Sequence, residues 1–219
     1  MHAEAELQTA REQLLQYCGR LTHDGLAVGA AGNMSVRVGD LVVITPSGVQ
    51  YHDMTARDMC VVTLAGEEVQ APETPSSELP MHLAIYARCQ AGAIVHTHSA
   101  EVIALSASRA ELPAIHYAIT ALGGPVRVAG YTRFGSDGLA QAAADALAGR
   151  RAAILQNHGA ICYGTTLTDA YDRAVLLEWL ARVYRRSLGY GEPRILSEAE
   201  LAAVAAESQR RRYGQRRQQ

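Results

Sequence analysis

Lysine is absent from this chain, because all 20 of its basic residues are arginine. Enzymes that form a Schiff base, attach pyridoxal phosphate or hold nucleotide phosphates in a P-loop all use a lysine ammonium group. The sequence therefore excludes each of these classes. An enzyme of this composition that stabilises a carbanion needs another electropositive group, and a metal ion is the obvious candidate.

Cysteine is scarce and dispersed. The four cysteines stand singly, without a CxxC spacing, so the sequence indicates neither a disulfide framework nor a thiolate zinc site. We expect buried free thiols and a cytoplasmic location. The cysteines are Cys18, Cys60, Cys89 and Cys162.

Long apolar runs and an excess of charge are also missing. Residues 1–16 carry charged side chains every few positions without the apolar centre of a signal peptide, and no apolar run approaches the length of a membrane span. The net charge of −2 and the pI near 6.4 give no reason to expect a nucleic acid or membrane partner. The arginines of the tail, 210–212 with 216 and 217, are interpreted as a solvated helix end.

The length of 219 residues and the hydrophobic content of 48% fit one α/β domain, which we expect to span residues 1–219. Apolar residues at helical spacing alternate with short β-type runs, and hairpins in the first half favour antiparallel pairing. The pattern predicts a three-layer α/β/α domain around a central, largely antiparallel or mixed sheet. Expected strands are 34–38, 41–44, 60–64, 93–97, 126–129, 152–155 and 160–163. Expected helices are 7–21, 77–89, 100–108, 136–147, 168–188 and one opened by a capping box at 197–200.

The strongest chemical motif is Val-His-Thr-His at the end of a predicted strand. His96 and His98 alternate with Thr97, so both imidazoles project from the same face. His158 lies in Asn-His-Gly directly after another apolar strand, and Glu78 stands at a helix N-terminus, which favours negative charge. Three imidazoles and a carboxylate suit Zn²⁺ and also accept Mn²⁺, Fe²⁺ or Co²⁺, so we predict a metal site at these residues.

Three short loops carry groups that could bind an anion. One ends in Gly32-Asn33, the second holds Ser47-Gly48, and the third places Ser76-Ser77 before Glu78. Backbone N–H groups and hydroxyls in such loops bind phosphate where they meet. Each loop alone is only a turn, and their convergence does not follow from the sequence pattern.

Seven motifs occur in the order found in one protein family, which the whole chain resembles. They are Gly32-Asn33, Thr45-Pro46-Ser47-Gly48, Pro75-Ser76-Ser77-Glu78, Val95-His96-Thr97-His98, Ile115-His116-Tyr117, Gln156-Asn157-His158-Gly159 and Tyr213-Gly214. The chain closely resembles the class II aldolase/adducin family. The resemblance implies a zinc-dependent aldolase that cleaves a ketose 1-phosphate, of the fuculose, 5-deoxyribulose or 5-methylthioribulose type, to dihydroxyacetone phosphate and a small aldehyde.

The resemblance also implies roles for single residues. His96, His98 and His158 match the family's zinc ligands, and Glu78 matches the carboxylate that binds the metal and then moves protons. Tyr117 matches the tyrosine that protonates the leaving aldehyde oxygen. Tyr213 matches a tail tyrosine that reaches the site; in the family both tyrosines come from a neighbouring subunit of a homotetramer. The family's phosphate pocket corresponds to Gly32, Asn33, Ser47, Gly48, Ser76 and Ser77.

One position departs from the family pattern, and other activities use the same scaffold. Ala30 stands where the family has a threonine whose hydroxyl touches phosphate, so one anchor is missing. Sugar-phosphate 4-epimerases, methylthioribulose-1-phosphate dehydratases and oxo-tetronate phosphate decarboxylases share the fold, but near residue 117 the epimerases place an aspartate and the dehydratases a Gln-Glu pair. Adducin head domains keep the fold as an interaction module without the metal histidines. The residues by themselves, without the resemblance, favour a half-buried core role for Tyr117 and a core stripe around Trp179.

Overall fold

Nine described strands form one sheet, and the bounds of seven of them follow the predicted apolar runs closely. They are β1 (Asn33–Val38), β2 (Leu41–Ile44), β3 (Cys60–Thr63), β4 (Glu68–Gln70), β5 (Ala93–Thr97), β6 (Glu111–Leu112), β7 (Val126–Ala129), β8 (Ala152–Leu155) and β9 (Gly159–Gly164). The computed structural model describes residues 2–211. The spatial order is β4-β3-β2-β1-β5-β9-β8-β7-β6. Only β7 and β8 pair in parallel among these strands, so the predicted mixed, largely antiparallel sheet is confirmed.

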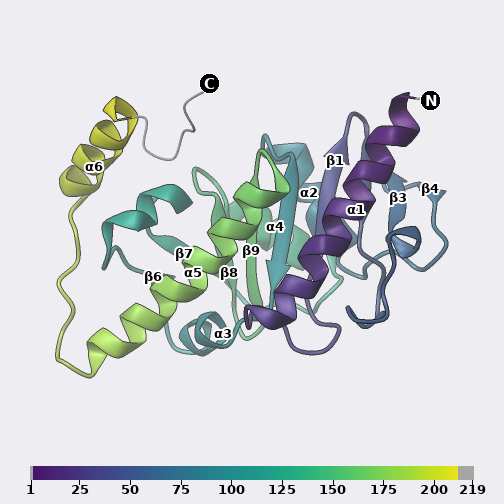
Figure 1. The fold of residues 1–219 in the computed structure, drawn as a ribbon. Helices are drawn as coiled ribbons and strands as arrows, with labels where there is room; N and C mark the ends of the chain where they lie inside the picture. The colour runs from purple at the N-terminus through teal and green to yellow at the C-terminus, as the bar shows by residue number, and fades with distance from the viewer. Residues whose placement is uncertain (1, 212–219) are drawn as a thin grey trace.

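Helices cover both faces of this sheet (Figure 1). One face carries α1, α3 and α5, and the other carries α2 and α4, which gives the predicted three layers. The helices are α1 (His2–His23), α2 (Leu79–Arg88), α3 (Ala100–Ser106), α4 (Asp137–Ala146), α5 (Leu167–Leu188) and α6 (Glu198–Arg210), with 3-10 turns η1 (Ala56–Asp58) and η2 (Tyr117–Leu122).

Alternation along β5 decides which layer each side chain enters. Ala93 and Val95 pack in the core under α1, α3 and α5, whereas Ile94 packs in the core under α2 and α4. His96 therefore projects to the α2 side of the sheet, because residues two apart in a strand share a face. The same alternation buries the thiol of Cys162 in β9, where it is free as predicted.

The sequence missed the two shortest strands and misplaced some details. All three side chains of β4 are exposed, so it shows no alternating pattern, and β6 has only two residues. Helix α5 begins at Leu167 after the N-cap Thr166, whose side chain accepts a hydrogen bond from the Asp169 N–H. Trp179 is 42% exposed, so the prediction that it belongs to a core stripe is wrong. No described helix combines the length and apolar character needed to cross a lipid bilayer.

Candidate metal centre and the cavity beside it

The strand register brings the separated motifs to one end of the sheet. Antiparallel pairing places Asn33, at the start of β1, opposite His96, near the end of β5. It also places Thr97 opposite Ala160. The β8–β9 hairpin that carries His158 therefore turns at the same sheet end as the loops that precede β1 and follow β5. Each of these two pairs is separated by 63 positions in the sequence, and the pairing of β1 and β9 with β5 makes them neighbours.

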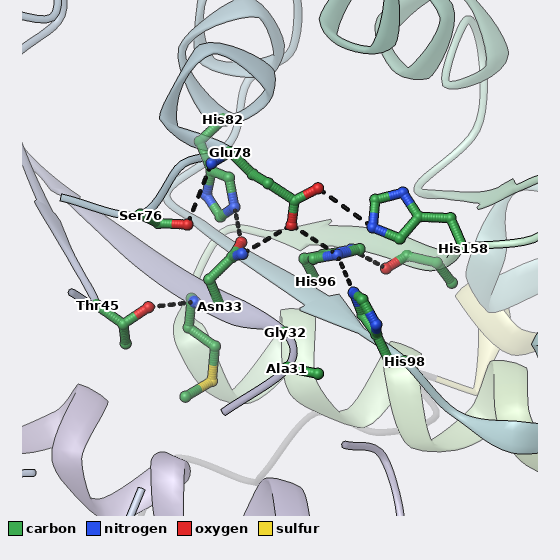
Figure 2. Close-up of polar contacts among 12 residues, drawn as sticks. Ala31, Gly32, Asn33, Thr45, Ser76, Glu78, His82, His96, His98 and His158 are labelled. Atoms are coloured by element: carbon green, nitrogen blue, oxygen red, sulfur yellow. Dashed lines mark hydrogen bonds and ion pairs between the residues drawn. The ribbon is translucent and has the colours of Figure 1, made fainter. Parts of the chain in front are cut away.

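The four predicted metal ligands lie around one point (Figure 2). One ligand atom from each of Glu78, His96, His98 and His158 lies within 4.8 Å of the other three. Nε2 of His96 is 2.9 Å from Nε2 of His98 and 2.9 Å from Oε2 of Glu78, and Nε2 of His158 is 3.2 Å from Oε1 of Glu78. The three rings meet edge to face, with centroids 4.8 to 4.9 Å apart. This arrangement could hold one metal ion.

Groups behind the ligands fix their orientation. Nδ1 of His96 lies 2.9 Å from the carbonyl oxygen of Ala160, to which it donates its proton, so the Nε2 lone pair faces the cluster. The side-chain amide of Asn33 donates to Oε2 of Glu78 over 2.9 Å. These contacts hold two ligands in place from outside the cluster, as is usual behind protein metal sites.

The charges of the cluster fit a cation. Burial alone would raise the pKa of Glu78, but His96 and His158 beside it lower that pKa far below its usual range, so the carboxylate is ionised. Burial first, and then repulsion from His96 and His158, lower the pKa of His98 to about 3. Oε1 of Glu78 is buried and accepts no hydrogen bond from any described residue. A buried carboxylate beside three imidazole nitrogens is a donor set that suits a divalent metal ion.

Two glycines and one asparagine allow the segments around residues 32 and 159 to approach the backbone of β5 closely. A Cβ atom at Gly159 would lie 2.0 Å from the carbonyl oxygen of Thr97, and one at Gly32 would lie 2.8 Å from that of His96. Gly32 also has a φ of +81°, which favours glycine. Asn157 has a φ of 53°, a region that asparagine tolerates better than most residues. The Gly-Asn and Asn-His-Gly motifs thus have a backbone explanation.

A cavity of about 290 Å³ opens beside this cluster of possible metal ligands. Its lining includes all six residues of the three loops that the sequence proposed for phosphate, together with Ala30. The second and third loops are joined by backbone hydrogen bonds from Ser47 N–H to Thr74 and from Ser76 N–H to Thr45. The N–H groups of Gly48 and Ser77 donate to no described residue. The remaining lining comes from Ala31, Pro46, Glu78, His98, Tyr131, Thr132, Phe134, Asn157 and His158.

Comparison with known proteins relates this geometry to named enzymes. Residues 12–185 match the profile of the class II aldolase and adducin N-terminal domain. The chain belongs to the class II aldolase and adducin family. It is 37% identical over 202 residues to 5-deoxy-D-ribulose 1-phosphate aldolase of Bacillus thuringiensis. The aligned region covers 91% of this chain and 95% of the relative.

Other members of the family agree in sequence and in fold. The 5-methylthioribulose-1-phosphate/5-deoxyribulose-1-phosphate aldolase of Rhodospirillum rubrum is 40% identical over 89% of this chain and 88% of its own length. The solved structure of an L-fuculose 1-phosphate aldolase superposes with a TM-score of 0.89 at 35% identity, over 92% of this chain and 96% of its own. The resemblance to the class II aldolase/adducin family is thereby confirmed.

One predicted site residue, Tyr117, lies apart from the cavity of its own chain. Tyr117 does not line the cavity, and its side chain is 53% exposed, so the core role that the residue alone favoured is wrong. Tyr213 lies outside the described residues. Sequence reasoning also missed three contributors: Tyr131 and Phe134, which line the cavity, and His82, which contacts Asn33. His82 follows Glu78 by four residues, which places both on one face of a helix and was the available signal.

Proposed function

We propose that this chain is a metal-dependent class II aldolase that reversibly cleaves a ketose 1-phosphate to dihydroxyacetone phosphate and a small aldehyde. One observation carries the proposal: a carboxylate and three imidazoles converge beside a cavity whose other wall offers N–H groups that donate to no described residue. Membership in the aldolase family supports the reaction type. The absence of lysine agrees with it, because cleavage through a Schiff base is excluded.

Glu78, His96, His98 and His158 would hold the metal ion. We propose Zn²⁺ for its preference for nitrogen with oxygen ligands, although Mn²⁺, Fe²⁺ and Co²⁺ accept the same set. The bound ion would act as a Lewis acid toward the carbonyl and hydroxyl oxygens of the ketose and so disperse the negative charge that develops as the C3–C4 bond breaks.

Proton transfer falls to the chain's own side chains. Tyr117 would handle the proton on the oxygen at C4, and Glu78 would return a proton to C3 of the three-carbon fragment. In the reverse, condensing direction the ionised carboxylate of Glu78 would act as the base that removes this proton from C3, and in the cleaving direction the resulting carboxylic acid would give it back. Glu78 also lines the cavity, so the same carboxylate faces both the proposed metal position and the space for a substrate.

The three loops would hold the phosphate. Some of their N–H groups join the loops to each other, and others would donate hydrogen bonds to the phosphate. The N–H groups of Ser47 and Ser76 are used between the loops, which leaves the N–H groups of Gly48 and Ser77 and the hydroxyls of Ser47 and Ser77 for the ligand. No arginine lines the cavity in the described chain. We propose that neutral donors bind the phosphate, as in backbone anion sites, and that the metal supplies the positive charge. The full set is Gly32, Asn33, Ser47, Gly48, Ser76 and Ser77.

A homotetramer with sites at its subunit interfaces would complete the machinery. Tyr117 is exposed and stands away from the cavity of its own chain. The ring of Trp179 lies edge-on to that of His116, next to Tyr117, so aromatic side chains cluster at this surface. Aromatic residues are enriched at protein interfaces. We propose that Tyr117, with Tyr213, serves the cavity of a neighbouring subunit, in a cytoplasmic enzyme whose four cysteines are free.

The aldehyde half would be small and largely apolar. Tyr131 and Phe134 line the cavity and are mostly exposed, so their rings are available to a ligand. Two of the relatives described above are named for 5-deoxyribulose 1-phosphate, and one of these also for 5-methylthioribulose 1-phosphate. We therefore propose substrates of the 5-deoxyribulose, 5-methylthioribulose or fuculose 1-phosphate type.

A substrate panel tests the proposal. The purified protein, loaded with Zn²⁺, is given these three ketose 1-phosphates, and release of dihydroxyacetone phosphate is followed with a coupled reductase. We expect metal-dependent release from at least one member and none from the unphosphorylated sugars. Conversion of a substrate without release would favour an epimerase or dehydratase, and a protein that is folded but binds no metal would favour an adducin-like interaction module.

A further inference from the structure

A chain of buried hydrogen bonds runs from the metal ligand Glu78 into the core. Asn33 Nδ2 lies 2.9 Å from Glu78 Oε2, and Asn33 Oδ1 lies 2.7 Å from His82 Nε2 (Figure 2). Nδ1 of His82 is 2.7 Å from the hydroxyl of Ser35, which is 2.8 Å from the hydroxyl of Tyr86. All five side chains are buried.

The carboxylate gives this chain of bonds a single direction. An ionised Glu78 only accepts, so the NH₂ group of Asn33 faces it and the oxygen of Asn33 faces His82. His82 must then donate from Nε2. A neutral imidazole carries one N–H, so its Nδ1 accepts from Ser35, and Tyr86 donates to Ser35. In this arrangement each of the four contacts between Glu78 Oε2 and the Tyr86 hydroxyl joins a donor to an acceptor, and the reverse direction would leave an amide oxygen against the carboxylate.

We propose that His82 is a positioning residue that acts through Asn33 to hold the Glu78 carboxylate among the three imidazoles. His82 is fully buried and does not line the cavity, so it has no route to the substrate. Its Nε2–H fixes which end of the Asn33 amide faces Glu78. Without that donor, the buried oxygen of Asn33 loses its partner and the amide is no longer held in one orientation.

The position of His82 on α2 makes the arrangement rigid. Its backbone N–H donates to the carbonyl oxygen of Glu78 over 3.3 Å, one helical turn away. Glu78 and His82 therefore approach Asn33 from the same helix face, and Asn33 itself is fixed in the sheet opposite His96. Asn33 also lines the cavity, so its orientation matters to both the metal and the proposed phosphate wall.

Two substitutions separate this role from simple core packing. His82→Gln keeps a donor near the place of Nε2 and loses the contact of Nδ1, whereas His82→Asn keeps a partner for Ser35 and loses the contact with Asn33. The measurements are Zn²⁺ affinity by competition with a chelating dye, the visible absorption spectrum of the Co²⁺ form, and kcat and KM. Tyr86→Phe, which alters only the far end of the path, is the control.

We expect His82→Asn to weaken Zn²⁺ binding by roughly 10- to 100-fold, to change the Co²⁺ spectrum and to lower kcat more than it raises KM. His82→Gln and Tyr86→Phe should stay near the wild type in affinity and spectrum. Equal losses in His82→Gln and His82→Asn, or an equal loss in Tyr86→Phe, would overturn the proposal and leave His82 as a packing residue.

A measurement on the unaltered protein covers the case in which His82→Asn does not fold. Nitrogen NMR of ¹⁵N-histidine-labelled protein should show the proton of His82 on Nε2, and a proton on Nδ1 would overturn the proposal. The kinetic part rests on the proposed aldolase activity, but the affinity, the spectrum and the tautomer do not. Failure of the aldolase assay with the expected order of metal affinities would thus contradict the proposed function and support the role of His82.

Discussion

The ring of Tyr117 stacks on the imidazole of His116, with centroids 4.5 Å apart and planes inclined by 28°. The imidazole of His116 is held in turn by the N–H of Ala118, which donates to its Nδ1 over 3.2 Å. The phenol ring of Tyr117 is therefore supported on one face by a fixed ring and is exposed to solvent. An exposed tyrosine that is held rigidly and stands away from its own cavity is suited to a neighbouring subunit.

Mixed oligomers test whether Tyr117 acts across an interface. Tyr117→Phe and His98→Ala should each abolish most activity alone. Unfolding and refolding the two variants together should restore activity, because some sites then combine an intact metal centre with an intact neighbouring tyrosine. Random assembly of a ring predicts about one quarter of the wild-type activity in an equal mixture. Absence of any recovery, with both variants shown by light scattering to assemble, would place Tyr117 within its own subunit or outside the reaction.

The close approach of β9 to β5 predicts a sharp difference between two glycines. Gly159→Ala would place its Cβ atom 2.0 Å from the Thr97 carbonyl oxygen and so force apart β9 and β5, next to the proposed metal ligands His158 and His96. We expect a loss of several kcal/mol in the free energy of unfolding and a loss of bound metal. Gly19→Ala in α1, where nothing lies within 4 Å, should instead stabilise the protein by about 0.5–1 kcal/mol. Thermal unfolding and metal analysis of the two variants check both values.

Features set by local spacing could be predicted from the sequence, whereas features set by contacts between distant segments could not. Helices and strands followed from apolar spacing, because burial on a sheet or helix face imposes a regular period on residues such as Leu7, Leu14 and Leu21. The cluster that could hold a metal ion followed partly from the two-residue spacing of His96 and His98. Long-range strand register is not encoded in a local pattern. The meeting of the loops, the contact of Asn33 with Glu78 and the exposure of Trp179 all depend on the tertiary fold and so could not be predicted.

The missing hydroxyl at Ala30 predicts a gain in substrate binding when it is supplied. Ala30 lines the cavity beside the proposed phosphate wall. Ala30→Thr adds a donor there, and one net hydrogen bond of about 0.5–1.5 kcal/mol corresponds to a fall in KM of roughly 2- to 10-fold with kcat unchanged. Ala30→Val adds nearly the same volume without the hydroxyl and is the matched control. If the two variants shift KM equally, the effect is one of size and the phosphate assignment of this wall is contradicted.

Removal of the charge at Glu78 should affect turnover far more than substrate binding. Glu78→Gln keeps the shape and can still contact Asn33, but it can no longer move a proton to or from carbon. We expect kcat to fall by about 10²–10⁴-fold, as for the loss of a general acid or base, with KM changed by much less. Metal content is measured alongside to separate proton transfer from metal loss. A metal-loaded variant with an unchanged rate would refute the role given to Glu78.

The pH dependence of folding stability should show the burial of His82. Burial lowers the pKa of His82 to about 3, whereas its pKa in the unfolded chain is about 6.5. Between about pH 3 and pH 6.5, His82 is therefore protonated in the unfolded state and neutral in the folded state. The resulting stability is complete above pH 6.5 and is lost as the pH falls toward 3, by up to about 1.4 kcal/mol per pH unit.

Comparison with His82→Gln isolates this contribution in metal-free protein. The glutamine variant lacks the titrating group but keeps every other histidine, including His98, whose lowered pKa contributes equally to both proteins. Urea unfolding at a series of pH values should therefore give a steeper decline for the wild type than for the variant below pH 6.5. Parallel curves would mean that His82 takes up its proton in the folded state without cost, which is incompatible with a neutral ring that donates from Nε2 to Asn33 and accepts at Nδ1 from Ser35.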